Sequence, residues 1–157
     1  MAVNRGKKFE QVIKRAFEKV PNVSIDRLHD QTNGFKGSQN ICDFIVYKEP
    51  YEYYIECKSV HGNTLPFSNI TDTQWNGLLE KSQIEGVFAG VICWWIDKDV
   101  TLFIPIQTFQ YYKSWNNAKS IRFDCGGSIE ITGKKKRVFF SYDMNKFFEE
   151  IENYGDN

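Results

Sequence analysis

Two stretches of sequence decide the fold, ICDFIVY at residues 41–47 and YEYYIECKSV at residues 51–60. Both are rich in β-branched and aromatic residues, which are enriched in β-strands. The short link between them contains a proline and favours a tight connection between antiparallel strands. In a hairpin centred on that link, Asp43 falls opposite Glu56. Because side chains alternate along a strand, every residue of the hairpin is then assigned to one of two faces.

One face of this hairpin is apolar and the other is charged. The apolar face, which we expect to lie in the core, comprises Phe44, Val46, Tyr53, Ile55 and Cys57. The charged face holds Asp43, Glu56 and Lys58. A solvated surface or a simple lysine–carboxylate ion pair would also produce this pattern. Two carboxylates directly opposite one another repel, however, unless a cation lies between them.

A divalent metal ion is the cation that best suits two carboxylates on a central sheet. Residues 87–96 are almost continuously apolar, which is typical of a strand covered on both faces, so the neighbouring hairpin should be partly covered. Carboxylate oxygens suit Mg²⁺, and the main-chain carbonyl of Cys57 could supply another oxygen. Lys58 could orient or activate a water molecule, or hold charge that develops on phosphoryl oxygens. The pattern predicts metal-assisted hydrolysis of a phosphodiester.

The remaining pattern predicts a single α/β or α+β domain over residues 1–157. Apolar residues at three- and four-residue spacing predict an amphipathic helix over residues 5–20. Residues 29–40 are polar and are expected to form a projecting loop or stalk, and residues 150–157 a flexible acidic tail. Further strands are expected at residues 23–28, 87–96, 100–104, 121–123, 128–132 and 137–142, and further helices at residues 72–84, 105–112 and from residue 143 onward.

Composition excludes some classes of protein and leaves others open. No apolar run approaches the roughly 20 residues of a membrane span, and no apolar segment follows the charged N-terminus, so we expect a cytoplasmic protein. The four cysteines form no CxxC pair and are expected to be reduced core residues. The 20 basic and 20 acidic residues cancel, which does not advertise nucleic-acid binding. Basic residues nevertheless cluster at the N-terminus and at residues 134–137.

Beyond this chemistry, the sequence resembles a known family. The spacing from Asp43 to Glu56-Cys57-Lys58 resembles the motif of the PD-(D/E)XK nuclease superfamily. Gly6-Lys7-Lys8-Phe9-Glu10 is similar to the G-x-x-F-E opening of RecU-type Holliday-junction resolvases. Residues 64–67 with Thr73-Gln74 and Leu78, and then residues 86–92, resemble the family's later segments. The resemblance spans roughly residues 6–106.

The resemblance implies a restriction-endonuclease-like core, in which a central mixed β-sheet is flanked by helices. It implies that Asp43 and Glu56, with the carbonyl of Cys57, bind Mg²⁺, for which Mn²⁺ would substitute. Lys58 would stabilise the transition state or orient water. Glu10 and Gln74 would be further residues of the metal and catalytic site.

The family also provides expectations about DNA. Residues 29–40 match the place of a stalk that enters a four-way junction, where Arg27, Lys36 and Phe35 could contact DNA. Lys7 and Lys8 are further candidate DNA contacts. RecU-like enzymes are homodimers, which places two active sites on two strands of the junction. The sequence departs from the family at Ile41, where a threonine is usual, and its predicted stalk is short and less basic.

Three hypotheses follow from the sequence. The first is a junction-resolving endonuclease that makes paired, metal-dependent nicks. The second is another PD-(D/E)XK endonuclease that acts on duplex or damaged DNA. The third is a DNA-binding module without catalysis, which Ile41 supports modestly, although Asp43, Glu56 and Lys58 are all present. Cleavage of a junction beside a duplex would separate the three.

Overall fold

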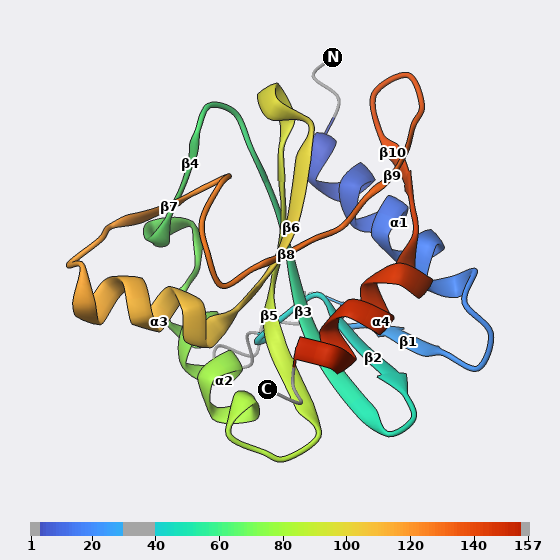
Figure 1. The fold of residues 1–157 in the computed structure, drawn as a ribbon, viewed down its shortest axis with the longest axis horizontal. Helices are drawn as coiled ribbons and strands as arrows, with labels where there is room; N and C mark the ends of the chain where they lie inside the picture. Colours follow the sequence, from blue (N-terminus) through green and yellow to red (C-terminus); the bar gives the residue numbers. More distant parts are fainter. Residues whose placement is uncertain (1–3, 30–39, 155–157) are drawn as a thin grey trace.

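A six-stranded mixed sheet organises the chain, with the strand order β1-β2-β3-β5-β6-β8 (Figure 1). The computed structural model describes residues 4–29 and 40–154. Strands β3 and β5 are parallel, and the other neighbours in the sheet are antiparallel. The strands of this sheet are β1 (Ser24–Arg27), β2 (Phe44–Lys48), β3 (Tyr51–Val60), β5 (Val87–Trp95), β6 (Val100–Pro105) and β8 (Ile129–Glu130).

Four helices and two small antiparallel ribbons complete the described fold. The helices are α1 (Arg5–Glu18), α2 (Asp72–Ser82), α3 (Ile106–Trp115) and α4 (Met144–Tyr154), with short 3₁₀ turns η1 (Phe67–Asn69) and η2 (Ile96–Lys98). The ribbons pair β4 (Thr64–Pro66) with β7 (Ser120–Arg122), and β9 (Gly133–Lys135) with β10 (Phe140–Tyr142). Among the described residues, no helix is both long enough and apolar enough to cross a membrane.

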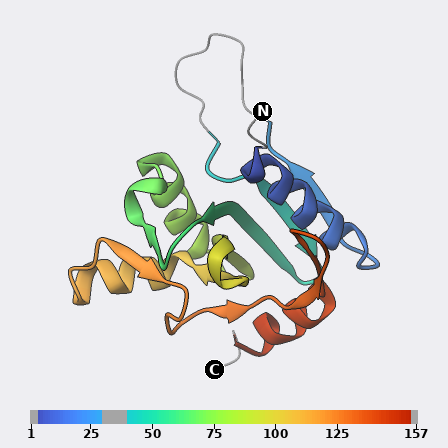
Figure 2. The same ribbon diagram turned by 90° about the horizontal axis from the view of Figure 1, so that it is seen from above.

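The helices cover the sheet on both faces. Helices α1 and α4 pack on one face, and α2 and α3 pack on the other (Figure 2). Strand β5 is buried on both sides. Ile92 and Trp94 pack in the core cluster under α1 and α4, while Val91, Cys93 and Trp95 pack in the cluster under α2 and α3. This two-sided burial explains why its sequence is a continuous apolar run. The predicted α/β fold with a central mixed sheet is confirmed.

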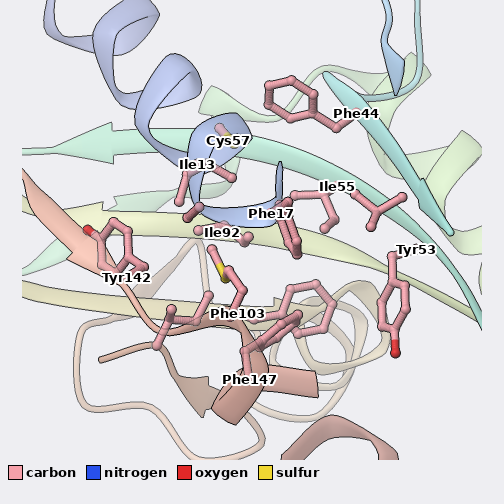
Figure 3. Close-up of a cluster of buried hydrophobic side chains, with 14 of the residues drawn as sticks. Ile13, Phe17, Phe44, Tyr53, Ile55, Cys57, Ile92, Phe103, Tyr142 and Phe147 are labelled. Atoms are coloured by element: carbon pink, nitrogen blue, oxygen red, sulfur yellow. The ribbon is translucent and has the colours of Figure 1, made fainter. Parts of the chain in front are cut away.

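The β2–β3 hairpin has the predicted register. Phe44 pairs with Ile55 and Val46 pairs with Tyr53. Their side chains are buried with Cys57 in the cluster under α1 and α4, part of which Figure 3 shows. Because one face of a strand is committed to the core, the remaining residues of the hairpin are directed to the side of α2.

Helix boundaries follow from local signals. Helix α1 begins after Asn4, whose Oδ1 accepts a hydrogen bond from the main-chain N–H of Lys7 at 3.2 Å. It ends at Glu18, two residues earlier than expected. Helix α2 begins after Thr71, which forms a reciprocal capping box with Gln74. Thr71 thereby fixes the first turn of the helix that carries Gln74.

The structure corrects two expectations, and a third concerns residues that lie outside the described part of the chain. Glu150 to Tyr154 belong to α4 rather than to a flexible tail, because Ile151 is buried in the core with the rest of the helix. No strand was expected between residues 60 and 87, but Thr64–Pro66 form strand β4, which pairs with β7. Of the predicted stalk, residues 30–39 lie outside the described residues, as do residues 155–157 of the predicted tail.

A close contact sets the distance between α2 and the segment that precedes β2. A Cβ atom placed on Gly77 would lie 2.2 Å from Cγ2 of Ile41. Glycine at this position therefore lets the helix approach Ile41 closely. Gly77 follows Gln74 by three residues, so the two lie on neighbouring positions of one helix face. The contact accordingly fixes where Gln74 sits over the sheet.

We expect Gly77→Ala to lower the free energy of unfolding by about 1 kcal/mol. Helix propensity alone would favour alanine by about 1 kcal/mol, but crowding against Ile41 costs roughly 1–3 kcal/mol. In an Ile41→Gly background the same substitution should become stabilising, since both the Cγ2 and the Cβ of Ile41 that a Cβ on residue 77 would meet are gone. Urea unfolding of the four proteins measures this coupling. Stabilisation by Gly77→Ala in the presence of Ile41 would contradict the contact.

Candidate active site

Asp43 is fixed where β2 meets its two neighbours. Its main-chain N–H donates to the carbonyl oxygen of Ile55 at 3.0 Å, and its own carbonyl oxygen accepts from the N–H of Leu28 at 2.8 Å. The Asp43 carboxylate then turns toward β3, where Oδ2 accepts a hydrogen bond from the N–H of Cys57 at 2.8 Å. The backbone of both strands therefore determines the position of this carboxylate.

Glu56 lies beside Asp43 and is buried, with only 4% of its surface exposed. Its Oε2 accepts a hydrogen bond from Nε2 of Gln74 at 3.1 Å. The same oxygen lies 3.0 Å from Nζ of Lys58, whose side chain is 22% exposed. The structure thus brings together four of the residues predicted from sequence, Asp43, Glu56, Lys58 and Gln74, and Lys58 connects the buried carboxylate with the surface.

Burial perturbs both carboxylates. Burial, together with the nearby Asp43 carboxylate, raises the pKa of Glu56 to about 8, and Lys58 only partly opposes this. Burial also raises the pKa of Asp43, against the opposing effect of the Cys57 N–H, and the charge of Glu10 adds to the increase. Two neighbouring carboxylates, of which one is buried and the other partly buried, cannot both be ionised without a large cost unless more positive charge is present.

Glu10 and Arg27 form an ion pair next to this site. Glu10, on α1, is partly buried and contacts the guanidinium of Arg27, on β1. Arg27 also lies 3.4 Å from the imidazole Nδ1 of His29. The influence of Glu10 on the pKa of Asp43 places it near the carboxylate pair. Arg27 was predicted as a DNA contact, and the pairing that it makes with Glu10 was not foreseen.

Gln74 connects the N-terminus of α2 with the carboxylate pair. Its Oε1 accepts from the N–H of Thr71 at 3.0 Å, while its Nε2 donates to Glu56. The amide oxygen is therefore engaged by the helix N-terminus and does not face the carboxylates. Gln74 lies at the site as predicted, but its geometry suits holding Glu56 in place rather than binding a metal. The T-x-x-Q spacing of a capping box is readable in the sequence and could have indicated this.

The other predicted DNA contacts lie on α1 or outside the described residues. Lys7 and Lys8 are exposed in the first turns of α1. Lys36 and Phe35 fall within residues 30–39 and lie outside the described part of the chain. The described residues therefore place only Lys7, Lys8 and Arg27 of the predicted contacts.

The donor set at this site fits Mg²⁺. Within residues 4–29 and 40–154, no group of three or more His, Cys, Asp or Glu side chains is arranged to hold a metal ion. Mg²⁺ needs fewer, because it is usually held by one or two carboxylates and keeps several waters or phosphate oxygens. The Cys57 N–H faces β2 and Asp43, and on a strand the carbonyl of a residue points to the same edge as its N–H. Asp43, Glu56 and the Cys57 carbonyl are thus the candidate oxygen donors where β3 meets β2.

Comparisons with known proteins give a similarity of fold. No family model and no curated protein matches the sequence. Among solved structures, the chain is similar to Hjc, a Holliday junction resolvase from the archaeal hyperthermophile Archaeoglobus fulgidus. The similarity covers 68% of this chain and 78% of that chain, with 18% sequence identity and a TM-score of 0.45. Similarity at this level leaves the function to be inferred from the side chains of the site.

Without divalent metal, we expect the protein to become less stable, relative to Glu56→Gln, as the pH rises from about 4.5 to about 8. The folded state raises the pKa of Glu56 from 4.5 to about 8, so folding favours the protonated form. This contribution is present at low pH and is lost as the pH rises through the folded-state pKa. Urea unfolding in EDTA across this range measures the difference. A difference that stays constant with pH would contradict the burial of an uncompensated carboxylate.

Proposed function

We propose that this chain is a metal-dependent endonuclease of the PD-(D/E)XK type that resolves four-way DNA junctions, with residues 1–157 as a single nuclease domain. The observation that carries the nuclease proposal is the buried Glu56 beside the partly buried Asp43, with Nζ of Lys58 3.0 Å from Glu56. Burial raises the pKa of both carboxylates, and Asp43 raises the pKa of Glu56 further, so the pair calls for a cation. The lysine adds a donor at the exposed rim. This combination suits hydrolysis of a phosphodiester.

Asp43, Glu56 and the carbonyl of Cys57 would hold Mg²⁺, and Mn²⁺ would substitute. When bound, the ion supplies charge neutralisation at the phosphate and lowers the pKa of a water molecule. Asp43 reaches this position because the Cys57 N–H anchors its Oδ2. Glu10 adds negative charge nearby, and Arg27 holds the Glu10 carboxylate in place.

Lys58 and Gln74 act on the substrate and on Glu56, respectively. The Lys58 ammonium lies at the rim of the buried pair, where it can orient the attacking water or stabilise charge on phosphoryl oxygens. Gln74 donates to Glu56 and so keeps its carboxylate turned toward the site. Glu56 must lose its proton before it can bind a cation, so cleavage should increase as the pH rises toward 8.

The proposed preference for junctions rests on observations other than the carboxylate pair. It is supported by the resemblance of residues 6–10 to the opening of RecU-type resolvases and by the exposed Lys7 and Lys8 on the same helix. A homodimer would provide two sites for paired nicks, and a cytoplasmic location would give access to DNA. An endonuclease acting on duplex or damaged DNA would use the same carboxylates, so the substrate must decide between the two.

We expect metal-dependent, paired nicks in an end-labelled synthetic four-way junction and little cutting of a linear duplex of the same sequence. Asp43→Asn and Lys58→Gln should each abolish cutting, because one removes a metal ligand and the other the charge at the rim. Asp124→Asn is the matched control, since Asp124 is exposed and pairs with Arg122 away from the site. Product patterns on denaturing gels with Mg²⁺ or EDTA are the measurement.

Each outcome of that assay has a distinct meaning. Cutting of the duplex that is lost in Asp43→Asn would keep the nuclease and reject the junction preference. Binding of the junction without cutting under any condition would favour a non-catalytic DNA-binding module. Cutting that survives Asp43→Asn would reject the proposed site altogether.

We expect Gln74→Ala to reduce cleavage about 10- to 100-fold, as is usual for a residue that positions a metal ligand. Thr71→Ala is the matched control, because it removes the other half of the capping box and leaves the Glu56 contact in place. Both variants should lose about 1 kcal/mol of stability from the helix cap. Cleavage rates across a Mg²⁺ titration, with urea unfolding alongside, separate the two roles. Equal loss of cleavage in both variants would assign Gln74 to capping alone.

A further inference from the structure

Helix α1 carries a row of cations on the flank away from Glu10. Lys8, Arg15 and Lys19 recur at helical spacing, so they follow one line along the helix. Glu10 lies on the other flank, where it contacts Arg27 of β1. One side of α1 therefore faces the candidate active site, and the other presents positive charge.

The basic run of residues 134–137 lies next to this row, in the β9–β10 ribbon (Figure 1). The ribbon is anchored to the core, because Phe139 packs on Trp94 with ring centroids 5.3 Å apart. The hydroxyl groups of Tyr142 and Thr101 share a buried hydrogen bond of 2.7 Å. The lysines and the arginine of the ribbon are thus presented from a fixed scaffold.

A groove of about 210 Å³ separates α1 from the ribbon. Arg15 and Lys19 line it from the helix, and Lys136 lines it from the ribbon, with Phe139 among its apolar residues. Nζ of Lys19 donates to Oγ of Ser141 at 3.2 Å and so connects the two walls. Among the described residues, no Asp or Glu lines the groove.

Of the cations in this row and in the basic run, only Lys135 has an ion-pair partner among the described residues. Glu18, on α1, pairs with Lys14 at 3.6 Å, and Asp99 pairs with Lys135. Within the described part of the chain, Lys136 and Arg137 have no ion-pair partner. Like charges held together without counter-charges raise the energy of the folded protein and favour a polyanionic ligand. The zero net charge hides this, since the acids of the C-terminal helix balance the total.

We propose that the groove between α1 and the β9–β10 ribbon binds the phosphate backbone of a DNA arm beyond the scissile site. The proposal rests on the proposed function for the identity of the polyanion. A DNA arm passing over the exposed face of α1 would meet the candidate active site on one flank and the groove on the other. The groove contributes affinity that does not depend on base sequence, because its cations would contact phosphates.

The test compares two double variants that each remove two positive charges. Lys136→Gln/Arg137→Gln alters the ribbon, and Lys119→Gln/Lys146→Gln alters exposed lysines elsewhere on the chain. Binding of the full chain to a fluorescein-labelled four-way junction and to a duplex is followed by anisotropy in EDTA at several salt concentrations. Thermal unfolding confirms that both variants are folded.

We expect the ribbon variant to weaken binding roughly tenfold to both DNAs, and to reduce the salt-dependence slope by about 0.9 for each phosphate that is no longer neutralised. The control variant should bind like the unaltered protein. Equal DNA affinities and salt-dependence slopes for the two variants would overturn the proposal. So would a ribbon variant that binds DNA like the unaltered protein but, in a parallel assay, no longer binds phosphatidylserine vesicles. The binding assay contains EDTA and does not depend on cleavage. Failure of DNA cleavage in the separate assay with Mg²⁺ would reject the proposed function. The binding comparison of the two double variants would still decide whether the groove binds DNA.

Discussion

The placement of a buried carboxylate, Glu56, beside a partly buried one, Asp43, is the constraint on which the site depends. Asp43 and Glu56 are held together by strand pairing, so neither can move away from the other without breaking the sheet. The surroundings reduce the cost only in part, through the Cys57 N–H, the Gln74 amide and the Lys58 ammonium. The raised pKa of Glu56 reflects the cost that remains uncompensated. A divalent cation would complete the balance of charge. The pair is therefore a reason to infer a metal and not a source of stability.

The core provides the rigidity that this arrangement requires. Phe44 and Ile55 pair on the buried face of the hairpin, and β5 continues the sheet with residues buried on both faces. A slip of one residue in the hairpin would turn the apolar face to the other side of the sheet. The same packing that stabilises the fold therefore fixes the carboxylates on the face toward α2. The contact of Ile41 with Gly77 then sets the position of Gln74 over them.

The sequence predicts those parts that depend on local periodicity. The position of the turn was enough to predict the register of the hairpin, and the alternation of side chains then predicted its core face and the three charged residues of the candidate site. The pairing of Glu10 with Arg27 could not be predicted, because it joins a helix to a strand through tertiary packing. Strand β4 was missed because it is three residues long and ends at Pro66. The tail was mispredicted because its acidic residues outweighed Ile151, which continues the apolar stripe of Phe147 and Phe148.

The most direct test of the central claim is anomalous diffraction at the manganese edge from crystals of the protein soaked in MnCl₂. We expect one strong peak per chain, within coordination distance of the carboxylates of Asp43 and Glu56 and of the Cys57 carbonyl oxygen. The peak should be absent from crystals of Asp43→Asn prepared in the same way. A metal-free carboxylate pair in the soaked crystals, or a peak that persists in Asp43→Asn, would contradict the inference that the buried pair is a divalent-metal site.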